Sequence, residues 1–173
     1  YFHFLNNHDA VIHSYVTLFS MYGKEEAKEL KTLFWTSFGK YMRKHATEYG
    51  SKIQWVNYKT GVKDVYFRLD ADKRTAKICV DLQHKDSEIR ELYYEQFLET
   101  KTVFHDLTGT EWIWTENLVD NYGKEISRIW LEIDHVNMYN KDTWESIFLF
   151  FEKYLLGLDE YWKEFKDLFK QLD

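Results

Sequence analysis

The sequence predicts an α+β fold in which one mainly antiparallel sheet packs against helices. Two segments, 65–70 and 78–83, alternate between apolar and polar residues and are separated by a polar stretch. This alternation is typical of a β-hairpin with one buried face. Segments with apolar residues three and four positions apart, typical of amphipathic helices, lie on both sides of the hairpin. The predicted order is therefore helix, three-strand antiparallel meander, helix, two strands and a long C-terminal helix.

The first predicted helix runs from Lys24 to about Tyr49, where Gly50 is suited to end it. A short strand is predicted from Ile53 to Tyr58, closed by a turn that contains Gly61. Together with the two alternating segments, it would complete the meander. The second predicted helix begins at Asp86 or Ser87, either of which can cap it, and ends at Gly109.

Two further strands are predicted at 111–115 and 125–133, around a turn at 120–124. Asp142 and Glu145 have capping-box spacing and predict the start of the last helix, with aspartate in place of the usual serine or threonine. One apolar stripe follows this helix to the C-terminus. A second apolar row lies beside it and predicts packing against the first helix or, alternatively, the seam of a homodimer. The row comprises Ile147, Phe150, Tyr154, Tyr161 and Leu168.

The composition fits one domain of 173 residues, with aromatic side chains, 19% of the chain, filling the core. Cys79 is the single cysteine, so no disulfide can form within the chain, and we expect a cytoplasmic location. The longest apolar run, at 147–151, is too short to cross a membrane. Because a clear helical pattern begins after Met21, we predict that residues 1–20 are an extension outside the core domain, which spans 21–173.

Several segments carry a family resemblance: LFWTSFGKYM (33–42), IQWVNYKTGVKDVYFRLDADKRTAKICVDLQHKD (53–86), YYEQFL (93–98), EWIW (111–114) and ISRIW (126–130). They resemble a bacterial domain of unknown function, DUF4268. Its motifs are mostly aromatic and strand residues, which identify a family but no reaction. In longer proteins that the chain resembles, this domain looks to be fused behind a nuclease-like module of the PD-(D/E)XK type. The resemblance implies a nucleic-acid-processing or defence context only by analogy.

One alternative follows from the order of elements, which is also the core order of PD-(D/E)XK nucleases. Those enzymes place acids on the second and third strands to hold Mg²⁺, and a lysine beside them to steady the attacking water. Asp64 and Asp81 occupy comparable places here, but Gln83 replaces the expected lysine and Lys85 comes two residues later. The alternative reading is therefore a divergent metal-dependent nuclease. The competing interpretation is that these residues form the solvated face of a hairpin.

The charge distribution predicts a binding surface. Residues 52–85 hold eight basic and four acidic residues, a net charge of +4, whereas the whole chain carries −6. A basic sheet on an acidic body can steer an anionic partner to one surface, and neighbouring aromatic rings can stack on bases. A solubilising charged hairpin is the simpler interpretation. The candidate binding residues are Tyr58, Lys59, Lys63, Arg68 and Lys77.

No other motif points to chemistry. The chain lacks a glycine-rich phosphate loop, and His45, His84, His105 and His135 do not pair with Cys79 at zinc spacing. We therefore expect no metal and no cofactor. The leading prediction is a non-enzymatic binding or accessory domain. Its expected partner is nucleic acid or a nuclease-type protein, with a homodimer as a further alternative.

Overall fold

The computed structural model describes the backbone of residues 7–45 and 53–172, and side chains within these ranges from residue 23 onward. It confirms the α+β class. Four strands form one antiparallel sheet in the order β1-β2-β4-β3. Their bounds are β1 Val65–Ala71, β2 Ala76–Leu82, β3 Ile113–Val119 and β4 Glu125–Ile133. Each predicted strand from residue 65 onward is present, because alternating apolar residues place one face of the sheet against the core.

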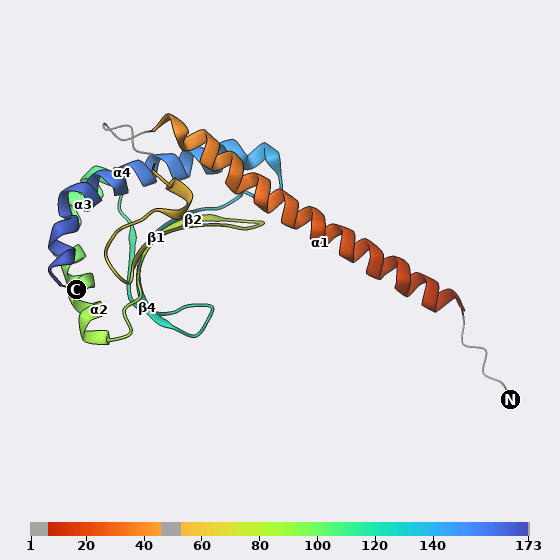
Figure 1. The fold of residues 1–173 in the computed structure, drawn as a ribbon, viewed down its shortest axis with the longest axis horizontal. Helices are drawn as coiled ribbons and strands as arrows, with labels where there is room; N and C mark the ends of the chain where they lie inside the picture. Colours follow the sequence, from red (N-terminus) through yellow and green to blue (C-terminus); the bar gives the residue numbers. More distant parts are fainter. Residues whose placement is uncertain (1–6, 46–52, 173) are drawn as a thin grey trace.

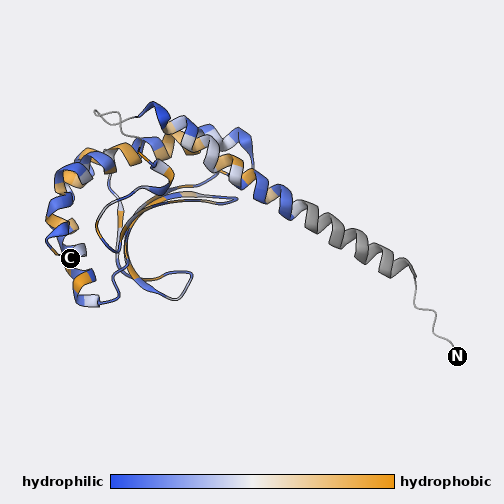
Figure 2. Ribbon diagram, in the orientation of Figure 1, coloured by the Kyte–Doolittle hydropathy of each residue, from blue (hydrophilic) through white to orange (hydrophobic). Residues whose placement is uncertain are grey.

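Three helices cover one face of this sheet, as Figure 1 shows: α2 (Ser87–Glu99), α3 (Lys101–Thr108) and α4 (Trp144–Lys170). The apolar sides of the helices turn toward the sheet, and the hydrophilic sides turn outward (Figure 2). Aromatic rings fill the layer between them. Trp162 of α4, for example, contacts Phe67 of β1 edge-on, with ring centroids 5.3 Å apart. The opposite face of the sheet, which we call the open face, is free of these helices.

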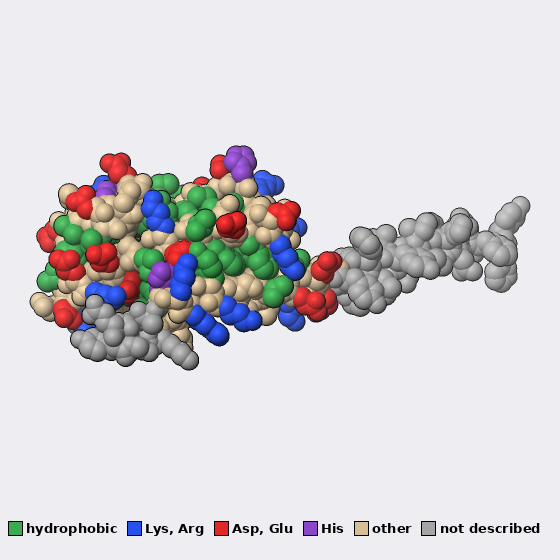
Figure 3. All heavy atoms as spheres, turned by 90° about the horizontal axis from the view of Figure 1, so that it is seen from above, with side chains coloured by type: hydrophobic (Ala, Val, Ile, Leu, Met, Phe, Trp, Pro, Cys, Tyr) green, Lys and Arg blue, Asp and Glu red, His purple; other side chains and the backbone are tan. Residues whose placement is uncertain are grey.

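Helix α1 (Asn7–Tyr41) lies along α4 with its C-terminal part and projects from the body with its N-terminal part (Figure 1). Phe34 and Phe38 are fully buried against α4, where both rings contact Phe148. At the end of the contact, Glu152 of α4 accepts a hydrogen bond from the Tyr41 hydroxyl. Seen from above, hydrophobic side chains gather over the middle of the body with charged ones around them (Figure 3).

The predicted strand from Ile53 to Tyr58 is wrong, because this segment contains a 3₁₀ turn, η2 (Trp55–Asn57). Trp55 is buried, and its indole nitrogen donates to the carbonyl oxygen of His45, 3.2 Å away. Packing of this one ring, not pairing with β1, fixes the segment. The first helix also differs, since α1 begins at Asn7 and gives way after Tyr41 to the turn η1 (Met42–Lys44). The predicted end at Tyr49 and Gly50 lies outside the described residues.

The predicted helix from residue 86 to 109 is two helices that meet at Thr100. The Thr100 hydroxyl lies within hydrogen-bonding distance of its own helix, at Gln96 O, and of the Tyr161 hydroxyl of α4. The local side-chain bond competes with a continuous helical ladder. Both predicted ends are confirmed: Asp86 caps α2 by accepting from the Glu88 amide, and Gly109 ends α3 in the left-handed conformation.

The predicted capping box at Asp142 and Glu145 is wrong. Asn140 caps the short turn η3 (Lys141–Thr143) by accepting from the Asp142 amide, and α4 continues from there. Two members of the second apolar row of α4 pack on α3 and the segment after it, in place of the predicted contact with the first helix. Tyr161 contacts Phe104, and Tyr154 contacts Trp112. The sequence did not predict that α3 would cover this side of α4.

Candidate functional site: the open face and the β1 edge

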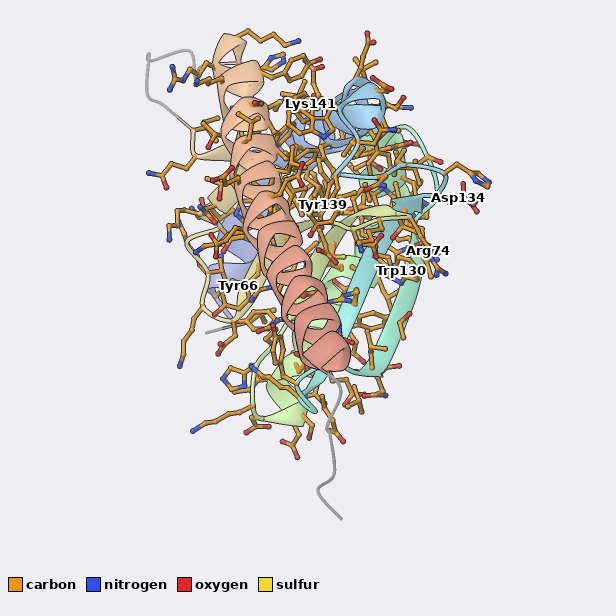
Figure 4. The ribbon with its side chains drawn as sticks, turned by 90° about the vertical axis from the view of Figure 1, so that its right-hand side faces the viewer. Tyr66, Arg74, Trp130, Asp134, Tyr139 and Lys141 are labelled. Carbon is orange, nitrogen blue, oxygen red and sulfur yellow. The ribbon has the colours of Figure 1, made fainter. Side chains whose placement is uncertain are left out.

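The open face of the sheet carries rows of charged and aromatic side chains. Strand pairing places Tyr66, Asp81 and Arg128 in one row across β1, β2 and β4. The next row holds Arg68, Cys79 and Trp130. Because side chains alternate along each strand, all six point away from the helices. In Figure 4, which views the molecule from the side toward which α1 projects, Tyr66 and Trp130 lie on either side of α1.

Asp81 anchors the first row. Its side chain is 1% exposed, and its two oxygens accept hydrogen bonds from Arg128 Nε at 2.6 Å and Nη2 at 2.8 Å. Arg68 Nε lies 3.4 Å from the same carboxylate. The hydrogen bonds to Asp81 raise the pKa of the Arg128 guanidinium. A two-point pair of this kind fixes the guanidinium plane, so Arg128 is held in a defined orientation on the open face.

The second row has a cationic rim. The Arg68 guanidinium lies over the Tyr66 ring, 4.6 Å from its centroid, and its side chain is 48% exposed. Lys77 approaches the Trp130 ring and pairs with Glu132 at 3.1 Å. Burial and the nearby Asp81 carboxylate raise the pKa of the Cys79 thiol to about 12. Cys79 is therefore a neutral filler between charged neighbours.

The loop between β3 and β4 borders this face and turns it into a groove of about 640 Å³. Asp120, Tyr122 and Lys124 of the loop line the groove opposite Arg68 and Arg128. Asp120 shapes the loop by accepting hydrogen bonds from the amides of Tyr122 and Lys124. Tyr122 is 95% exposed, so its ring is free to contact a ligand.

A second groove of about 250 Å³ runs along the free edge of β1, between Tyr58 and Lys59 on one side and Tyr66 and Arg68 on the other. Tyr58 is held firmly: its hydroxyl donates to Asp159 Oδ1 at 2.6 Å, and its ring stacks on Phe67. Burial, followed by the bond to Asp159, raises the pKa of Tyr58. Lys59 is exposed beside it.

A third hollow of about 470 Å³ lies on the other side of Tyr58 and Lys59, against α4. It shares these two residues with the second groove, and the second groove shares Arg68 with the first. The three hollows therefore adjoin. We name the cations that line them the basic strip: Lys59, Arg68, Lys77, Lys124, Arg128, Lys163 and Lys166. Four aspartates share the lining, which leaves a net charge of +3 on a chain of −6.

The predicted binding residues are thus divided. Lys59, Arg68 and Lys77 belong to the basic strip, and Tyr58 forms its wall as a ring fixed by Asp159. Lys63 is exposed in the turn before β1 and lines none of the three hollows. The structure thus brings four of the five predicted residues to one connected surface.

The residues of the nuclease alternative are spread over the end of the hairpin. Asp64 has a φ of 59° before β1, and its carboxylate lies 3.9 Å from His84 Nε2. Gln83 Nε2 lies 3.4 Å from Asp81, but Asp64 and Lys85 do not line the groove that holds that pair. Within the described ranges, no three His, Cys, Asp or Glu side chains gather closely enough to hold a metal ion.

Sequence reasoning missed Arg128, Lys163 and Lys166. Arg128 lies within a predicted strand, but only the strand order shows that it faces Asp81. Lys163 and Lys166 lie on the last helix, far along the chain from the hairpin. The sequence does contain one indication of this part of the site. Asp159 is an acidic residue inside the apolar stripe of the last helix, between Leu155 and Trp162. A buried carboxylate of this kind needs partners, here Tyr58 and Lys163.

Across residues 7–45 and 53–172, no helix combines the length and hydropathy that a membrane span needs. Searches among curated proteins and among solved structures gave no match. A family model, described as a domain of unknown function, matches residues 30–166, most of the chain and all of the sheet. The chain therefore belongs to the DUF4268 family.

Proposed function

We propose that this chain is a non-enzymatic binding domain for single-stranded nucleic acid, whose phosphates lie along the basic strip. The observation that carries the proposal is that neighbouring hollows share lining residues, which places cations of β1, β4 and α4 along one surface. Lys59 makes no ion pair among the described side chains, Lys124 lies near Asp120 without a direct ion pair to it, and the Arg68 side chain is 48% exposed. These groups are available to phosphates, whereas Tyr66 and Tyr122 are exposed rings that can stack on bases.

Single-stranded ligands fit this surface better than a duplex, because the strip bends from the open face around the β1 edge to α4. The chain's net charge of −6 predicts weak binding that depends on low salt. The cytoplasmic location, the processing or defence context and the nuclease-type partner belong to the same proposal. A homodimer remains a separate prediction.

The test is fluorescence anisotropy with a labelled single-stranded oligonucleotide at a series of salt concentrations. Each phosphate contact contributes a slope of about −0.7 in log affinity against log salt. We expect Lys59→Ala and Arg68→Ala each to weaken binding and to make the slope shallower by about that amount. Lys141→Ala is the matched control, because Lys141 is exposed on η3 and lines none of the hollows. No binding at low ionic strength, or equal effects of all three variants, would refute the proposal.

The nuclease alternative stays a prediction. The contacts favour binding over catalysis, since both oxygens of Asp81 already accept hydrogen bonds from Arg128. Arg128 already supplies a positive charge against Asp81, and this charge disfavours a metal cation at the same carboxylate.

A further inference from the structure

The hollow between α4 and the segment before β1 has a composition of its own. Three lysines line it, Lys59 from the segment and Lys163 and Lys166 from α4. Tyr58, Trp162 and Ile53 supply the apolar part of its wall. Its volume of about 470 Å³ lies within the usual range for small-molecule sites, about 300–1,000 Å³. It is therefore large enough for more than a simple anion.

The charges in this hollow do not balance. Asp159 is 6% exposed, and Oδ1 accepts from Tyr58 while Oδ2 lies 2.5 Å from Lys163 Nζ. Each oxygen of the carboxylate thus has a partner. Lys59 and Lys166 make no direct ion pair among the described side chains, although Lys166 lies near enough to Asp167 to interact with it electrostatically, so two ammonium groups border the same space without a bonded carboxylate. A ligand with two negative charges would offset their repulsion.

The backbone around the hollow is built to hold this arrangement. Gly61 has a φ of +71°, and a Cβ atom placed on it would lie 2.6 Å from Lys166 Nζ. The left-handed backbone at this position favours glycine, and the Lys166 ammonium group lies close over it. Trp162 Nε1 donates to Thr60 O at 2.8 Å, and the Thr60 hydroxyl donates to Val65 O at 2.7 Å. These bonds tie the loop to both α4 and β1, so the site is formed before any ligand arrives.

We infer that this hollow binds the phosphomonoester of a nucleotide, either at the end of a nucleic-acid strand or on a free mononucleotide. A terminal phosphate carries about −1.5 to −2 charges at neutral pH, whereas each internal phosphate carries one, so a single terminal phosphate can match the charge of Lys59 and Lys166 together. The hollow also lies at one end of the basic strip, closed behind by the buried Trp162. The strand-end form of the inference rests on the proposed function, and the mononucleotide form does not.

The first experiment compares one short oligothymidylate with a 5′-phosphate, with a 3′-phosphate and with neither, its dye kept away from the tested end. We expect one phosphorylated form to bind at least about tenfold more tightly than the unphosphorylated strand, the effect of one charge-assisted hydrogen bond. Lys166→Ala should abolish that preference, and it should weaken the unphosphorylated strand only by the one phosphate contact that each cation of the basic strip supplies. Lys170→Ala is the control, because Lys170 lies one turn later on α4 and pairs with Asp167.

The second experiment measures binding of thymidine monophosphate and thymidine by titration calorimetry. Binding of the phosphate form alone, lost in Lys166→Ala, supports the site even where no strand binds, and then only the proposed function fails. Equal affinity for all three strands, together with no heat from thymidine monophosphate, overturns the inference while leaving the proposed function intact. If the protein binds neither the strands nor thymidine monophosphate, both the inference and the proposed function are refuted.

Discussion

Gly157 lies where α4 passes closest to the end of α3. A Cβ atom at this position would lie 2.8 Å from the carbonyl oxygen of Leu107 and 2.9 Å from Thr108 Cα, and both neighbours are backbone. From the sequence alone, we expect Gly157 to bend the last helix, at a cost of about 1 kcal/mol relative to alanine. In the structure, glycine at this position instead stabilises the fold relative to alanine, because it permits the close contact between the two helices.

We expect Gly157→Ala to lower the free energy of unfolding by about 1–3 kcal/mol, as overpacking does in cores, measured by chemical denaturation. Gly39→Ala is the matched control within α1, where a Cβ would meet only Val56 Cγ2 at 3.7 Å. That substitution should leave stability unchanged or raise it by up to about 1 kcal/mol. A destabilising effect of the same size at both glycines would contradict the close-contact explanation.

His105 fastens the start of β3 to α3. Its Nε2 accepts hydrogen bonds from the Trp112 amide at 3.3 Å and from the Trp114 indole at 3.1 Å, so this nitrogen must be unprotonated. Burial, aided by the positive charge of Lys101, lowers the pKa of His105 below 6.5, while Glu111 and Asp106 oppose the shift. The unfolded chain therefore takes up a proton on this ring more readily than the folded one.

The stabilisation from His105 is expected to be complete above pH 6.5 and to be lost as the pH falls through the lower folded-state value. The check is the free energy of unfolding as a function of pH for wild type and His105→Gln. The difference between the two proteins should be largest at neutral pH and shrink on acidification. A constant difference would show that protonation of His105 is not coupled to unfolding.

At the scale of elements, local patterns predicted the four strands of the sheet, the start of α2 and the end of α3, but they did not predict features that depend on distant partners. Val65, Phe67 and Leu69 alternate because one sheet face is buried, and no distant residue is needed to see it. The segment from Ile53 to Tyr58 has similar apolar residues, yet the burial of Trp55 holds it as a 3₁₀ turn. The break at Thr100 likewise depends on Tyr161, far along the chain.

The candidate site likewise combines residues that local sequence predicts with residues that only the fold brings together. Lys59, Arg68 and Lys77 were predictable because they lie within one basic stretch of sequence. The pairing of Arg128 with Asp81 follows from β2 lying beside β4, a neighbour relation that no local pattern contains. For the same reason the third hollow could not be predicted, since it joins Tyr58 to Asp159 across two distant elements.

The contact between β2 and β4 also bears on catalysis. Because Arg128 occupies both oxygens of Asp81, we expect no cleavage of single- or double-stranded DNA in the presence of Mg²⁺ or Mn²⁺. The measurement is a gel assay of labelled DNA with each metal. Metal-dependent cleavage that disappears in Asp81→Ala, but persists in Asp70→Ala on the neighbouring strand, would establish the nuclease alternative instead.

At the scale of the whole molecule, α1 joins the body through its C-terminal part. The described ring contacts with α4 involve Phe34, Trp35, Phe38 and Tyr41, and the residues from Gly23 to Glu26 are exposed. The family match begins at Leu30. Helix α1 itself continues without a break through Met21, where the sequence predicts a domain boundary.

We expect deletion of residues 1–20 to leave a folded protein whose melting temperature changes little, because the described contacts with the body lie beyond the deleted part. Circular dichroism during heating measures this. Replacing Phe34 with alanine in the full chain is the comparison, since truncating a buried aromatic residue costs about 3–5 kcal/mol. A fall of tens of degrees on deletion would show that the segment completes the core.

The strand order has a consequence for the time course of folding. The two outer pairs, β1 with β2 and β3 with β4, are hairpins between neighbours in the chain, and hairpins form within about 1–10 μs. The central pair is different, since Leu82 meets Ser127 and Ala76 meets Ile133 only after α2, α3 and β3 have been looped out between them. Closing that loop costs entropy before any contact repays it. We therefore expect the union of two preformed hairpins to limit the folding rate, and the open face, whose rows cross β2 and β4, to be assembled last.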